Sequence, residues 1–77
     1  MGRVKMMKLY SSNVLIGEPD YLPFDQMELI GEFEDEQACV KEIVQRVGEQ
    51  HYIRFLLLGH AKAVDYGSWG HFFYIVE

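Results

Sequence analysis

One segment of this 77-residue chain has the periodicity of an amphipathic helix, and it limits the folds open to the rest. Apolar residues recur there at the spacing of a single helix face: Val40, Ile43, Val44 and Val47. Asp35 precedes the segment and Gly48 follows it, and both are typical helix-capping residues. We therefore predict one helix over about residues 36–47. A helix of this length can cover only part of a sheet.

Apolar runs on both sides of this helix predict strands. They lie at residues 4–10, 27–33, 51–58 and 72–76, with a further short strand at 61–66. Residues 11–13 have turn chemistry, and residues 14–16 either extend the first strand or return as a hairpin arm. Two prolines place a loop at residues 17–26.

This order, β(β)–β–α–β–(β)–β, predicts an α+β fold in a single domain over residues 1–77. We expect a small, mainly antiparallel sheet of four to five strands, with the helix packed on one face. The uncovered face must then be polar or meet a partner.

The strand at residues 27–33 alternates between an apolar face and a mostly acidic face. Met27, Leu29, Gly31 and Phe33 are expected to share the core face. The opposite face is expected to point to water and to carry Glu28, Ile30 and Glu32.

Acidic residues concentrate in one stretch of the chain. Eight of the twelve Asp and Glu residues lie between Glu18 and Glu36, and no Lys or Arg occurs from Leu9 to Val40. Residues 9–40 therefore carry a charge of −8, whereas residues 1–8 carry +3 and the remainder sums to zero. The negative charge behind the net value of −5 is thus concentrated in one segment. Such a segment produces a local negative potential, which favours partners with a basic surface.

Within this stretch, two prolines and several apolar residues make the loop at 17–25 a candidate contact surface. The predicted partner-binding residues are Glu18, Asp20, Tyr21, Phe24, Asp25, Glu28, Glu32, Glu34, Asp35 and Glu36. Two alternatives remain open. The apolar side chains of the loop can fold back onto the core, and the last three acids suit the start of a helix.

These features predict a small acidic, non-enzymatic module that binds and inhibits a larger protein. The chain is similar in kind to small acidic regulators encoded by bacteriophages and mobile elements. A sharper version is a DNA mimic that occupies a basic nucleic-acid-binding surface, although same-face strand residues recur only every ~6.6 Å and DNA charges every ~3.4 Å per strand. Direct binding of nucleic acid is disfavoured by the acidic segment, and a homodimer through sheet edges or faces is plausible.

The alternative function is a small ligand- or metal-binding domain that uses His60, Asp65, His71 or Cys39. The spacing of these residues matches no compact metal motif, and no nucleotide or nucleophile motif occurs, so no cofactor and no catalytic residue is predicted. One cysteine and the lack of an apolar run long enough for a membrane span favour a cytoplasmic protein.

Overall fold

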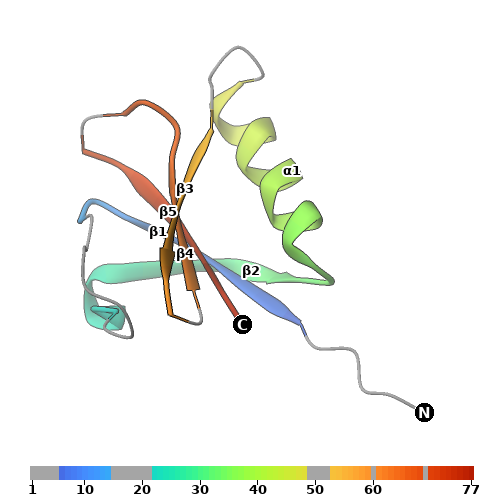
Figure 1. Cartoon of the computed structure of the whole chain (residues 1–77), viewed down its shortest axis with the longest axis horizontal. Coiled ribbons are helices and arrows are strands. Elements are labelled where there is room, and N and C mark those ends of the chain that lie inside the picture. The colour runs from blue at the N-terminus through green and yellow to red at the C-terminus, as the bar shows by residue number, and fades with distance from the viewer. Residues whose placement is uncertain (1–5, 15–21, 49–52, 60, 69) are drawn as a thin grey trace.

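The chain forms two layers, a five-stranded antiparallel sheet and one α-helix that packs against one face of the sheet (Figure 1). This computed structural model describes residues 6–14, 22–48, 53–59, 61–68 and 70–77. The elements in chain order are β1 (Met7–Ser12), the 3-10 helix η1 (Phe24–Gln26), β2 (Met27–Phe33), α1 (Glu36–Val47), β3 (Arg54–Leu58), β4 (Ala61–Asp65) and β5 (Phe72–Val76). The predicted α+β fold class is confirmed.

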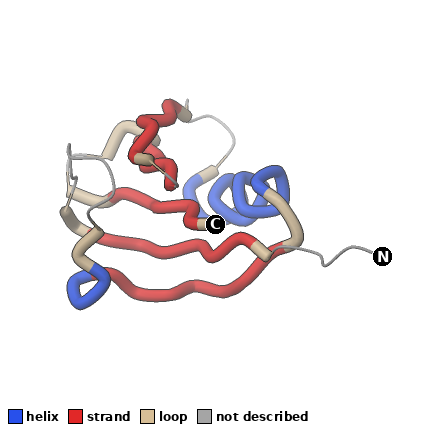
Figure 2. Tube along the Cα trace, turned by 60° about the horizontal axis from the view of Figure 1, so that its bottom comes forward, coloured by secondary structure: helices blue, strands red, loops and turns tan. Residues whose placement is uncertain are grey.

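The strand order within the sheet is β2-β1-β5-β4-β3, so β2 and β3 form the two edges. Every neighbouring pair of strands is antiparallel. The chain leaves the sheet at the β2 edge, forms α1, and enters it again as β3 at the opposite edge. The main contacts of α1 are with β1, β2 and β5, and Figure 2 shows the helix beside the C-terminal end of β5. At its start, the Glu36 carboxylate also reaches Lys62 of β4.

Local signals at both ends define α1. The Asp35 carboxylate accepts a hydrogen bond from the Ala38 amide at 2.9 Å, which caps the first turn. Gly48 ends the helix with a φ of 98° and donates its amide to the Val44 carbonyl at 2.8 Å. In the part of the chain that the structure describes, no helix is long and apolar enough to cross a membrane.

The first strand differs from its predicted position. Ser11 and Ser12, predicted as a turn, are the last two residues of β1 and pair with both β2 and β5. The Ser12 hydroxyl still bonds locally, because it accepts a hydrogen bond from the Val14 amide at 3.0 Å. Two backbone ladders hold these serines extended, and their turn preference does not decide the outcome.

Between α1 and the sheet lies the first of two apolar clusters. Its fully buried members are Leu9, Cys39, Ile43, Val64, Phe73 and Ile75. Partly buried side chains from β2, among them Ile30 and Phe33, complete it. Of the four helix positions predicted to face the core, Ile43 is fully buried in this cluster, and Val40 and Val47 pack against it.

The opposite face of the sheet is also apolar at its centre. Leu58, Ala63, Phe72 and Tyr74 are buried there, with Tyr10, Leu22 and Met27 packed against them. The Tyr74 hydroxyl donates to the Val14 carbonyl, which ties the segment after β1 to this face. The prediction that this face is polar or meets a partner is therefore wrong for its centre, because the chain's own side chains cover it.

A register shift in β2 changes which side chains share a face. The pairing of β1 with β2 shifts between Leu9 and Tyr10, so that Leu9 lies opposite Gly31 and Tyr10 opposite Leu29. Ile30 is the extra residue, and it packs on the helix side. Glu28 and Glu32 therefore lie on opposite faces of the sheet, and the predicted Glu28–Ile30–Glu32 row is wrong. The predicted core row is wrong too, because Met27 and Leu29 lie on the face away from α1, whereas Gly31 and Phe33 lie on the helix side.

Candidate functional site

Two acidic residues of the stretch, Asp25 and Glu32, lie beside a small aromatic and aliphatic patch that includes part of β2. Its centre is Phe24, the first residue of η1. The Phe24 amide donates to the Leu22 carbonyl at 2.9 Å, and the Gln26 amide donates to the Pro23 carbonyl at 2.8 Å. This tight turn buries Pro23 and packs Leu22 inward, so the Phe24 ring remains 50% exposed.

The Phe24 ring does not stand alone. It meets the Tyr10 ring edge-on, with centroids 5.3 Å apart and an interplanar angle of 61°. Tyr10 lies directly opposite Leu29 across the β1–β2 pair, and Leu29 is 49% exposed. Directly opposed residues of a strand pair share a face, so Phe24, Tyr10 and Leu29 form one continuous surface, which we call the aromatic patch.

Acidic side chains form the rim of the aromatic patch. Asp25 follows Phe24 in η1 and is exposed. Glu28 precedes Leu29 in β2 and is also exposed, but it lies on the opposite face of the strand. A polar hollow of about 470 Å³ lies beside them and is lined by Ser11, Ser12, Asn13, Asp25, Gln26, Met27, Glu28 and His71. Glu32 is exposed on the same face as Leu29, with Lys8 opposite it.

The remaining acids of the stretch have structural partners at the start of α1. Asp35 caps the helix, and the Glu36 carboxylate accepts from the Lys62 ammonium at 2.6 Å. Glu34 is exposed between β2 and α1. The structure thus separates the predicted acids into a helix-start group and a patch-rim group. Glu18, Asp20 and Tyr21 lie outside the described residues.

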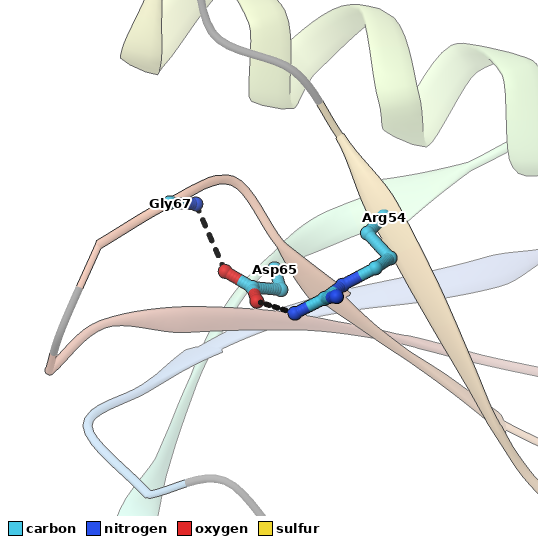
Figure 3. A network of polar contacts seen from close by, with 3 residues as sticks. All are labelled: Arg54, Asp65 and Gly67. Carbon is cyan, nitrogen blue, oxygen red and sulfur yellow. Dashed lines mark hydrogen bonds and ion pairs between the residues drawn. The ribbon is translucent and has the colours of Figure 1, made fainter.

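Residues of the alternative ligand site have other roles. The Asp65 carboxylate accepts from the Gly67 amide at 2.9 Å and from the Arg54 guanidinium at 3.0 Å, as Figure 3 shows. The Gly67 hydrogen bond, followed by Arg54, lowers the pKa of Asp65. His71 Nδ1 shares a hydrogen bond with the Tyr66 hydroxyl at 2.7 Å. These contacts engage both carboxylate oxygens of Asp65 and one ring nitrogen of His71.

Cys39 lies on the buried face of α1. Its burial raises the pKa of the thiol to about 11, and Asp35 and Glu36 add to the effect. A buried neutral thiol is a poor nucleophile and a poor metal ligand. Within the described ranges, no group of three or more His, Cys, Asp or Glu side chains is placed to hold a metal ion. His60 lies outside these ranges.

A second exposed surface was not identified from the sequence. Three consecutive residues of β3 are solvent-exposed: Phe55 at 40%, Leu56 at 44% and Leu57 at 70%. A continuous apolar run usually marks a strand that is buried on both faces, so the composition of β3 alone predicts a buried strand. Only the strand order, which places β3 at an edge, reveals it.

Comparisons with known proteins identified no relative of this chain. No protein-family model matches the chain, and searches of curated proteins and of solved structures found no match. The functional argument therefore rests on the aromatic patch, its acidic rim and the β3 edge.

Proposed function

We propose that this chain is a small, non-enzymatic protein-binding module that holds a basic surface of a larger protein against its aromatic patch. The observation that carries the proposal is the continuity of Phe24, Tyr10 and Leu29 on one face, with exposed acids around them. Aromatic anchors inside a charged rim are the usual arrangement of a protein interface.

Charge and apolar contact have separate tasks in this proposal. The acidic rim accelerates the encounter with a basic partner, and this contribution weakens as salt screens it. Phe24 and Leu29 slow dissociation, because their apolar surface, which is exposed in the free protein, is removed from water in the complex. By occupying the basic surface, the module inhibits whatever else binds there.

A nucleic-acid-binding protein is the class of partner that we favour, since such proteins present basic surfaces. The geometry of β2 does not support mimicry of DNA by a row of carboxylates along this strand, because Glu28 and Glu32 lie on opposite faces. The proposed mimicry therefore rests on the charge of the segment alone. The reducing cytoplasm is the proposed compartment, supported by the single, buried cysteine.

Affinity capture from a cell lysate with matched variants tests the proposal. Leu29→Lys places a positive charge in the aromatic patch, and we expect it to weaken retention of the partner at least about tenfold. Leu56→Lys introduces the same side chain at a similarly exposed position on the opposite edge and should retain the partner. Wild-type retention should fall between low and moderate salt.

Two outcomes decide the proposal. Equal retention by both lysine variants would exclude the aromatic patch as the binding surface. Duplex DNA added to the captured complex then tests the mimicry version separately: displacement supports it, whereas retention removes it and leaves a protein-binding module with a different kind of partner.

A further inference from the structure

The two edges of the sheet are chemically different. Edge strands present unpaired backbone N–H and C=O groups, which can pair with a strand of another molecule. In the strand order, β2 and β3 hold these edge positions. What each edge carries determines which of them can accept another strand.

The β2 edge has two features that oppose strand addition. Its register shift places Ile30 as an extra residue, and such a bulge disturbs the ladder that a new strand needs. Glu28 and Glu32 are exposed along it. Pairing two copies through β2 would bring these carboxylates close to their equivalents, so like charges would repel.

The β3 edge has neither feature. Its pairing with β4 runs without a shift from Arg54 to Leu58. Phe55, Leu56 and Leu57 are exposed, and because side chains alternate along a strand, the edge is apolar on both faces of the sheet. The helix adds little cover here, since its main contacts are with β1, β2 and β5.

Charges beside β3 are paired with each other. Arg54 forms an ion pair with Asp65 at 3.0 Å, and Lys62 forms one with Glu36 at 2.6 Å. The Lys62 ammonium also lies 5.7 Å from the centre of the Phe55 ring. A molecule of net charge −5 can therefore approach a second copy of itself at this edge with little repulsion.

We propose that two copies of this chain associate through antiparallel pairing of their β3 strands about a two-fold axis at Leu56. Leu56 then lies opposite Leu56 of the second copy, and Phe55 lies opposite Leu57 of the second copy. All these contacts are apolar, and the two five-stranded sheets become one continuous sheet.

Symmetry favours this arrangement over other edge pairings. An isologous pair of identical edges closes as a dimer, whereas pairing β3 with β2 would leave a free edge on each end and grow into a filament. The bulge and carboxylates of β2 oppose that growth. The dimer also leaves the aromatic patch accessible, because the patch includes residues of β1 and β2 and none of β3. The proposal is therefore independent of the proposed partner binding.

Sedimentation of the purified full chain at micromolar concentration tests the association. We expect wild type to sediment at twice its mass of 9.0 kDa. Leu56→Lys places two ammonium groups opposite each other at the axis and should yield the monomer. Leu29→Lys, the matched control on the β2 edge, should remain dimeric. A monomeric wild type, or a dimeric Leu56→Lys, would overturn the proposal.

Cysteine substitutions test the register. Opposed residues of an antiparallel pair have Cα atoms ~4.5–5.5 Å apart, within the range that a disulfide spans. Leu56→Cys should therefore cross-link two copies under mild oxidation with diamide. Leu57→Cys should not, because two Leu57 positions are offset by two residues in this register, beyond the ~7 Å limit.

The native Cys39 is buried and does not interfere with this assay. Cross-linking by Leu57→Cys in place of Leu56→Cys would refute pairing about Leu56. Circular dichroism of each variant verifies that the fold is retained, which the exposure of both positions favours.

Discussion

At the scale of single residues, the pKa of the Cys39 thiol is determined by burial and not by the position of the residue near the start of a helix. The residue lies in the first turns of α1, where the helix dipole favours a thiolate. Its side chain is nevertheless fully buried against Leu9 and the other members of the helix-side cluster. Burial, together with Asp35 and Glu36, raises the pKa of the thiol to about 11 from an ordinary value of 9.0. Cys39 is therefore a core residue.

This raised pKa predicts a loss of stability in alkali. The neutral thiol is favoured by the fold, so its contribution is present below pH 9.0 and is lost as the pH rises toward 11. Between about pH 8 and about pH 10.5, we expect this single group to reduce the free energy of unfolding by about 2 kcal/mol. Urea denaturation at the two pH values measures the change.

Cys39→Ala is the control for this pH dependence. Other groups also titrate in alkali, so the relevant quantity is the extra loss of the wild type over the variant. Equal losses in both proteins would show that the Cys39 thiol does not contribute to the alkaline change.

At the scale of elements, the start of α1 depends on one side chain. The Asp35 carboxylate satisfies the Ala38 amide, which otherwise has no partner within the helix. We expect Asp35→Ala to reduce the free energy of unfolding by about 1 kcal/mol, and Asp35→Asn, which keeps an acceptor oxygen, to reduce it less. Urea denaturation should rank the stabilities as wild type, Asn variant and Ala variant. An Ala variant as stable as the wild type would contradict the capping role.

The helix could be predicted from the sequence because every signal that defines it is local. Asp35, Gly48 and the spacing of four apolar residues all lie within or beside the segment, and the observed bounds are the predicted ones. The strands Met27–Phe33 and Phe72–Val76 were also predicted correctly, since aliphatic and aromatic residues dominate both.

The faces and the end of two strands were not predictable, because they depend on partners distant in the chain. Alternation along β2 indicated an acidic face, but the register shift opposite Leu9 and Tyr10 turns Ile30 inward. Ser11 and Ser12 have turn preference, but pairing with β2 and β5 holds them in β1. These pairings join segments that are distant in the chain, so the sequence of one segment alone does not define them.

At the scale of the whole molecule, strand order places two surfaces at opposite edges of the sheet. Counting charges located the acidic stretch, and the exposed Phe24 and Asp25 belong to the residues expected to bind a partner. The contributions of Tyr10 and Leu29 to the aromatic patch come from cross-strand pairing, and the exposure of β3 comes from the sheet order. Neither is visible in a segment read by itself.

The proposed dimer links folding to association and predicts a melting temperature that rises with protein concentration. Only folded chains pair through β3, so each tenfold increase above the dissociation constant stabilises the dimer by about 1.4 kcal/mol, or about 0.7 kcal/mol per chain. For a domain of this size, that corresponds to roughly 3–5 °C. Calorimetry over a hundredfold concentration range measures the shift.

The lysine variants distinguish this linkage from non-specific effects of concentration. Leu56→Lys should melt at one temperature throughout the range, because it cannot pair at the axis, whereas Leu29→Lys should follow the wild type. Both variants carry the same added charge on a half-exposed leucine, so a general electrostatic effect would change them equally. A wild-type melting temperature independent of concentration, with monomers in sedimentation, would reject the dimer and leave the aromatic patch to be tested by itself.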